Sequence, residues 1–132
     1  MSDKATLYKN ACDKATELFG TPIGDLTDLP MDPDDPWTKE LNSWVFGYLF
    51  GERSAIPIKE KVLIFIAMCS ASGRYDMLKR WLTAAINTGS SYKEVQDIIL
   101  TTTIYGGWPV ARESLQVLAA HWPNADKAYG PK

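Results

Sequence analysis

The chain has 132 residues and a mass of 14.7 kDa, which is enough for one domain with its own hydrophobic core. Hydrophobic residues make up 45% and charged residues 23%, a composition that argues against intrinsic disorder. The net charge of −2 leaves no excess of positive charge for general nucleic-acid binding.

The first predicted helix begins at Ser2 as N-cap and ends at Gly20. Residues 20–36 are rich in proline and aspartate and are expected to form a loop on the surface. Its aspartates are Asp25, Asp28, Asp32, Asp34 and Asp35. A metal-binding alternative for them lacks the glycine and terminal glutamate of a calcium loop.

Asp35 followed by Pro36 is typical of an N-cap and a first-turn proline, and predicts a second helix that ends at Gly51. Pro57 is expected to open a third helix. Its apolar run over residues 62–69 shows no polar face, which predicts burial on all sides. A buried strand is the alternative, because Val, Ile and Phe also favour strands.

Three further helices are predicted after Gly73. The fourth ends at Gly89, and the fifth begins with a capping box of Ser91 and Glu94 and runs to Tyr105. A turn at residues 106–107 precedes a sixth helix opened by Pro109. The prediction is therefore an all-α protein of about six antiparallel helices, forming a single domain over residues 1–132.

The numbers of cysteine and histidine residues limit the disulfides and metal sites that the chain can form. Cys12 and Cys69 are far apart and do not indicate a disulfide scaffold, and the one histidine, His121, cannot form a multi-histidine metal site by itself. His121 is expected near a helix C-terminus, where it can complement the helix dipole. We expect no metal and no cofactor. The polar N-terminus lacks a secretory signal and no apolar run is long enough for a membrane span, so a cytoplasmic protein is expected.

Five tryptophans are many for one small domain, and some are expected to line a pocket or a subunit interface. They are Trp37, Trp44, Trp81, Trp108 and Trp122.

Four segments occur in a familiar order and spacing. They are IAMCSASGR at 66–74, AAINTG at 84–89, Glu94 with Val95, and IYGGWPVA at 104–111, preceded by FGER at 50–53 with Lys59 and Lys61. Together, over roughly residues 40–120, they resemble the carboxymuconolactone decarboxylase family. The resemblance implies an alkylhydroperoxidase-like all-α fold and assembly as trimers or hexamers. It also implies sites built partly between subunits, and no metal or organic cofactor.

The resemblance distinguishes two enzymatic branches. The cysteine pair of the peroxidase branch falls on Arg74 and Met77, so thiol redox chemistry of that kind is excluded, and Cys69 is expected to be an inert core residue. In the decarboxylase branch, the family histidine falls on Trp81. Tryptophan cannot exchange a proton near neutral pH and offers only a hydrogen-bond donor.

Decarboxylation needs a cationic anchor for the carboxylate, donors for the developing oxyanion and an acid to protonate carbon. Arg53 and Arg74 are the predicted anchors, with a solvated surface charge as the alternative for each. Glu52 and Tyr105 are the candidate proton-handling groups, and could instead be a helix-end carboxylate and a phenol at the edge of the core.

Three further residues complete the predicted site. Asp76 could face the Trp81 region, one helical turn away. Trp81 and Trp108 could form an aromatic wall against a flat ring, which would suit a bulkier or more apolar substrate than the family's small dicarboxylate.

The function predicted on this basis is a cofactor-free lyase, a decarboxylase, or an isomerase of a small cyclic carboxylate or lactone in the metabolism of aromatic compounds. The alternative is a non-catalytic oligomer on the same fold that binds an aromatic ligand.

Overall fold

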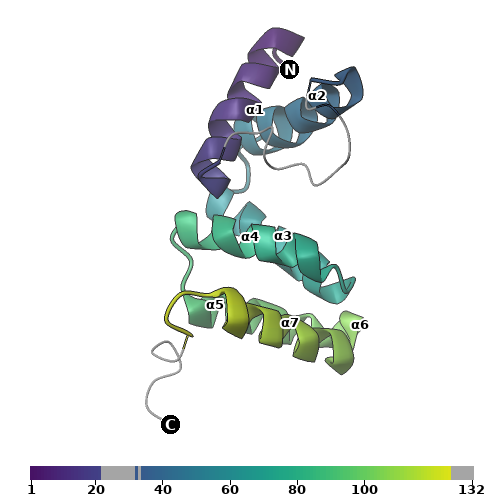
Figure 1. Cartoon of the computed structure of the whole chain (residues 1–132), viewed down its shortest axis with the longest axis vertical. Helices are drawn as coiled ribbons and strands as arrows, with labels where there is room; N and C mark the ends of the chain where they lie inside the picture. Colours follow the sequence, from purple (N-terminus) through teal and green to yellow (C-terminus); the bar gives the residue numbers. More distant parts are fainter. Residues whose placement is uncertain (22–31, 33, 126–132) are drawn as a thin grey trace. The chain divides into compact units, whose positions relative to one another are not determined.

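The computed structural model describes residues 1–21, 32 and 34–125. Most of the predicted loop over residues 20–36, including Asp25 and Asp28, lies outside these residues. Within them every regular element is a helix, as Figure 1 shows. The chain divides into two compact units, Met1–Ile58 and Lys59–Lys132, which are described one at a time. The prediction of a single domain stays a prediction.

The first unit contains α1 (Lys4–Phe19), α2 (Pro36–Asn42) and the π-helix η2 (Ser43–Glu52). The N-cap of α1 is Asp3, whose carboxylate accepts a hydrogen bond from the Thr6 N–H at 2.8 Å. The prediction of Ser2 at this position was therefore wrong, and Ser2 makes a different contact described below. Gly20 ends α1 in the left-handed conformation (φ 71°), as predicted.

The start of the second helix is confirmed, since the Asp35 carboxylate accepts from the Trp37 N–H at 2.9 Å. The helix then widens into η2, which the sequence did not predict. Gly47 of η2 lies against α1 so closely that a Cβ there would collide with the carbonyl oxygen of Leu7. Phe19 and Phe46 pack edge to face beside this crossing, with ring centroids 5.7 Å apart.

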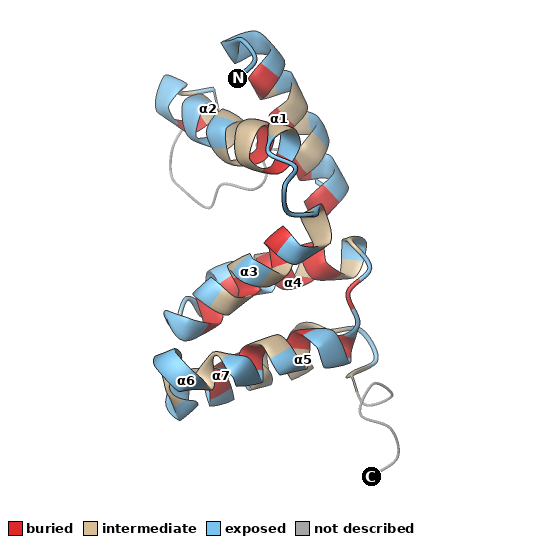
Figure 2. Ribbon diagram, turned by 180° about the vertical axis from the view of Figure 1, so that it is seen from behind, coloured by how far each residue is buried: buried red, intermediate tan, exposed pale blue. Residues whose placement is uncertain are grey.

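The second unit holds α3 (Ile58–Ala71), α4 (Tyr75–Asn87), α5 (Tyr92–Thr101), α6 (Thr103–Gly106) and α7 (Trp108–His121). In Figures 1 and 2, α3 and α4 form one layer and α5, α6 and α7 form the other. The buried positions coloured in Figure 2 follow the helix faces between the layers. The apolar side chains with no exposure there include Val62, Ile66, Leu78, Leu82, Val95, Ile99, Ala111 and Leu118.

The helix predictions hold in this unit with two differences. The predicted fifth helix is divided, because α5 ends at Thr101 and a short α6 follows. The third helix is not buried on all sides, since Ile64 and Met68 are exposed. Both lie on the side of α3 away from Val62 and Ile66, so the unit covers only one face of this apolar helix.

Two close approaches, one near each end, show how α4 and α7 are oriented relative to each other. A Cβ on Gly73, just before α4, would lie 3.7 Å from Val110 at the start of α7. Ten residues later, Thr83 Oγ1 lies 3.0 Å from the Nε2 of His121 at the end of α7. The two helices therefore run side by side in the same direction. None of the described helices has the length and apolar character to cross a membrane.

Candidate functional site

The seven predicted site residues fall in both units. Glu52 and Arg53 lie at the end of η2 in the first unit. The other five belong to the second unit and are Arg74, Asp76, Trp81, Tyr105 and Trp108.

Two turns between helices of the second unit, which we call its corners, lie next to each other. A Cβ on Gly106, at the end of α6, would lie 2.9 Å from the Cα of Ala71 at the end of α3. The contact between Gly73 and Val110 joins the same two corners. The turn from α3 to α4 and the turn from α6 to α7 are therefore in direct contact.

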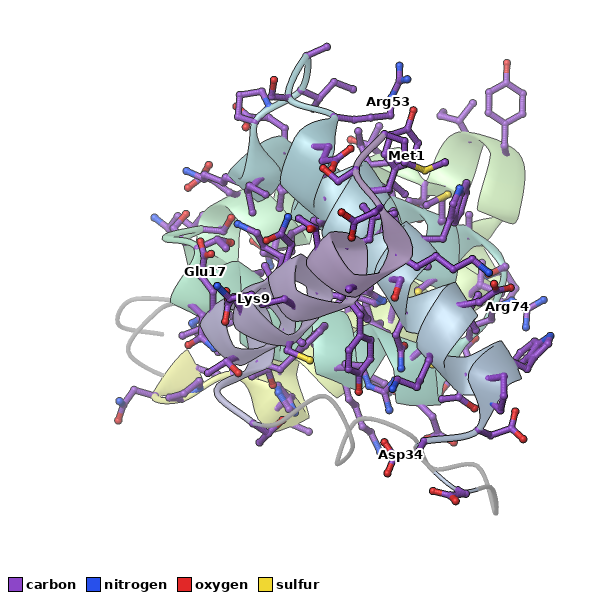
Figure 3. All side chains as sticks on the ribbon, turned by 90° about the horizontal axis from the view of Figure 1, so that it is seen from above. Met1, Lys9, Glu17, Asp34, Arg53 and Arg74 are labelled. Carbon is purple, nitrogen blue, oxygen red and sulfur yellow. The ribbon has the colours of Figure 1, made fainter. Side chains whose placement is uncertain are left out.

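Three of the predicted residues lie on these corners. Arg74 is the N-cap residue of α4, and its backbone N–H donates to the Cys69 carbonyl at 2.9 Å. Tyr105 is 99% exposed and Trp108 is 52% exposed. Tyr105 is thus not a phenol at the edge of the core. Figure 3 shows the Arg74 side chain extending away from the ribbon.

Trp81 lies inside the second unit. Its side chain is 4% exposed and packs edge to face on Phe65 of α3, with ring centroids 4.5 Å apart. Of the two residues predicted to form an aromatic wall, only Trp108 offers an exposed ring. Asp76 is exposed and lies 3.8 Å from the ammonium of Lys79.

Glu52 has a defined partner in the first unit. Its Oε1 and Oε2 accept from the backbone N–H of Ser2 at 3.1 and 3.3 Å. This hydrogen bonding lowers the pKa of Glu52 below its usual value. The carboxylate is therefore ionised at neutral pH and carries no proton to donate. Arg53, which follows η2, is exposed, and its backbone N–H donates to the Tyr48 carbonyl at 3.0 Å.

Cys69 is buried, which confirms its prediction as a core residue. Burial raises the pKa of its thiol, and the nearby charge of Arg74 opposes this in part. Among the described residues, no three His, Cys, Asp or Glu side chains come together as candidate metal ligands.

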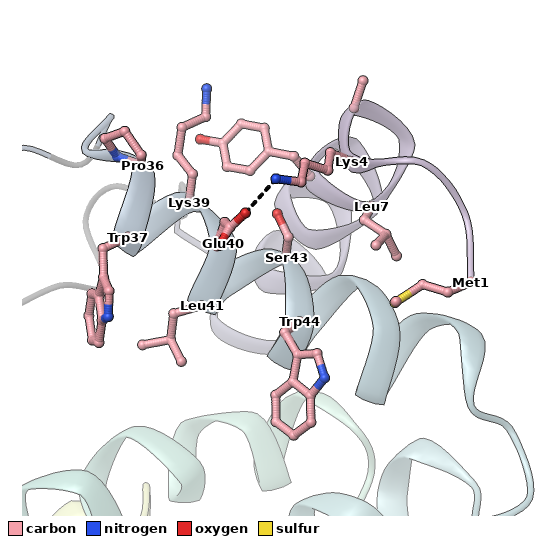
Figure 4. Close-up of a pocket in the computed structure, with 12 residues that line it drawn as sticks. Met1, Lys4, Leu7, Pro36, Trp37, Lys39, Glu40, Leu41, Ser43 and Trp44 are labelled. Carbon is pink, nitrogen blue, oxygen red and sulfur yellow. Dashed lines mark hydrogen bonds and ion pairs between the residues drawn. The ribbon is translucent and has the colours of Figure 1, made fainter.

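The first unit carries a groove that sequence reasoning did not locate. It has a volume of about 840 Å³, and Figure 4 shows the residues that line it. Trp37, Leu41 and Trp44 extend from one side of α2 and η2, and both indoles are more than half exposed. The spacing of these three residues was the available signal, and it agrees with the expectation that some tryptophans line a pocket.

Charged groups also line this groove. The Lys4 ammonium pairs with Glu40 Oε1 at 2.7 Å, and the Lys39 ammonium lies 4.5 Å from the centroid of the Tyr8 ring. The pair lowers the pKa of Glu40 and raises that of Lys4, in each case mainly through their hydrogen bond.

The all-helical fold agrees with a comparison against known families. The model of the carboxymuconolactone decarboxylase family matches residues 39–120, more than half of the chain, and the chain therefore belongs to this family. A similar protein is the 4-carboxymuconolactone decarboxylase of Acinetobacter baylyi, which is 24% identical over 113 residues. That alignment covers 83% of this chain and 82% of the relative. The resemblance inferred from the sequence is confirmed, and both findings support a decarboxylase-like function.

Proposed function

We propose that the protein is a cofactor-free lyase that removes the carboxyl group of a small cyclic carboxylate or lactone. Family membership and the name of the relative support this class of reaction. The observation that carries the proposed site is the position of Arg74, Tyr105 and Trp108 on two adjoining corners of the second unit.

These three groups match what the reaction needs. The Arg74 guanidinium binds a carboxylate through two parallel N–H donors, which a lysine cannot reproduce. When the bond to the carboxyl carbon breaks, its electron pair passes into the conjugated carbonyl of the ring and carbon dioxide leaves. The Tyr105 hydroxyl then donates to the developing oxyanion, and the Trp108 indole covers one face of the ring.

Proton delivery must differ from that of a histidine enzyme. Trp81 stands at the position where the family resemblance places histidine, and its indole can donate a hydrogen bond but cannot exchange a proton near neutral pH. We assign protonation of the carbon to Tyr105. The tyrosinate that remains takes a proton back from water, since the Tyr105 side chain is exposed. In this proposal Asp76 orients the polar substituents of the substrate.

The test is carbon dioxide release from 4-carboxymuconolactone and related carboxylated lactones. Arg74→Ala should lower kcat/KM by about 100-fold, in the range found when one donor to a developing charge is removed. Lys93→Ala is the control, because Lys93 is an exposed cation near the start of α5 and is not one of the proposed site residues. Equal activity of wild type and Arg74→Ala would refute the site.

The second candidate is a non-catalytic protein that binds an aromatic ligand. The burial of Trp81 at the histidine position favours it, because no imidazole remains at that place. This candidate predicts that aromatic acids quench tryptophan fluorescence with no product formed.

We further propose that the chain assembles as a trimer or hexamer, as the family resemblance implies. The exposed apolar side chains of Ile64, Met68 and Ile104 support this, because water-exposed groups of this kind are typical of subunit interfaces. Light scattering should then give a mass of three or six times 14.7 kDa. A mass of one chain at micromolar concentration would refute assembly.

A further inference from the structure

A cleft outside the proposed site lies between α4 and α7. Its volume is about 500 Å³, and the residues that line it are Lys79, Glu113, Gln116, Val117, Ala120 and His121. It combines an ammonium, a carboxylate, an amide and the only imidazole of the chain over a floor of small apolar side chains.

The imidazole of His121 is held in place by the neighbouring helix. Its Nε2 lies 3.0 Å from Thr83 Oγ1, and the ring is half-buried. Because α4 and α7 run in the same direction, the residue one turn before Thr83 lies farther along the same cleft, and this residue is Lys79. The ammonium and the imidazole therefore face one hollow from two helices.

The charged side chains around the cleft are only loosely paired. Lys79 lies 3.8 Å from Asp76, and Glu113 lies 3.5 Å from Arg112. All four side chains are more than half exposed, and exposed pairs of this kind contribute little to stability. Lys79 can therefore exchange Asp76 for a ligand at small cost.

We propose that this cleft binds a small monocarboxylic acid with a short apolar body. The carboxylate accepts from the Lys79 ammonium, and the His121 imidazole and the Gln116 amide supply further donors. The apolar body covers Val117 and Ala120. The Glu113 carboxylate repels the carboxylate of the ligand. The ligand carboxylate is therefore expected near Lys79 and not near Glu113.

The single histidine makes the test direct. In NMR spectra at pH 7, the carbon-bound protons of the His121 ring give one set of imidazole signals, which are followed during titration with butyrate. We expect a saturable shift in the millimolar range. Sodium chloride at the same ionic strength, 1-butanol and inorganic phosphate should not reproduce it. An equal shift with phosphate would overturn the assignment to carboxylic acids, and no shift with butyrate would overturn the site.

Charge variants test the assigned roles. Lys79→Gln should raise the dissociation constant of butyrate about tenfold, and Glu113→Gln should lower it. Lys9→Gln, an exposed lysine of α1, is the matched control and should leave it unchanged. Unchanged binding in Lys79→Gln would refute the proposal. Butyrate binding should persist in Arg74→Ala, so that failure of the proposed lyase site and failure of this cleft are separate results.

Discussion

The indole of Trp81 meets the ring of Phe65 edge to face, with centroids 4.5 Å apart and ring planes at 72°. This contact joins α4 to α3 inside the second unit. The Trp81 side chain therefore contributes to the packing of the second unit.

Replacement of Trp81 should consequently destabilise the fold. Trp81→Ala should lower the free energy of unfolding by about 3–5 kcal/mol, because it removes a large buried side chain and its aromatic partner contact. Urea denaturation followed by circular dichroism measures this. Trp37→Ala, at an exposed indole, is the control and should cost less than about 1 kcal/mol. Equal losses in the two variants would contradict the packing role.

Gly47 should not tolerate a side chain. In Gly47→Ala the new Cβ collides with the backbone of α1 at Leu7, so η2 and α1 must move apart, at a cost of about 1–3 kcal/mol. Gly51→Ala is the comparison within the same helix, since its Cβ would approach only the Phe46 carbonyl, at 3.3 Å. Thermal unfolding of both variants tests this, and a Gly47→Ala protein as stable as wild type would show that the crossing is looser than described.

Glu94 should make stability depend on pH. Its carboxylate accepts from the Ser91 N–H at 3.0 Å and pairs with Lys59 at 3.1 Å, and the Ser91 hydrogen bond is the main cause of its lowered pKa. Because the pKa is lower in the folded state, Glu94 stabilises the fold above its unfolded-state pKa. This contribution is lost as the pH falls through the folded-state pKa.

The difference in urea midpoint between wild type and Glu94→Gln should therefore be largest near pH 7 and shrink in acid, below the usual glutamate range. A difference that does not change with pH would contradict this assignment.

Cys69 should react slowly with thiol reagents. Its thiol is buried and its pKa is raised, so little thiolate is present at neutral pH, whereas Cys12 is partly exposed. In the Cys12→Ser variant, Cys69 is the remaining thiol, and its labelling by a disulfide reagent should be slow until denaturant is added. In the Cys69→Ser variant, Cys12 remains and should be labelled faster. The reverse order of rates would contradict the burial of Cys69.

Local sequence signals predicted the helices well because caps and turns depend on neighbouring residues. Asp35 with Pro36, Ser91 with Glu94, and Gly20 all occupy the predicted roles. The widening of η2 and the break before α6 were not predictable. They accompany close approaches to distant segments, at Leu7 for Gly47 and at Ala71 for Gly106.

The site was predictable only as a set of residue types. Arg74 and Tyr105 could be placed at helix ends from their motifs, but contact between their two corners depends on tertiary packing. The partner of Glu52 could not be predicted either, because Ser2 is fifty residues away in the sequence.

The most direct test of the account is a crystal structure with an unreactive cyclic dicarboxylate bound. We expect one carboxylate on the Arg74 guanidinium through two hydrogen bonds, the ring against Trp108 and the Tyr105 hydroxyl within hydrogen-bonding distance. A ligand bound in the groove of Trp37 and Trp44, with Arg74 making no contact to it, would contradict the proposed lyase site.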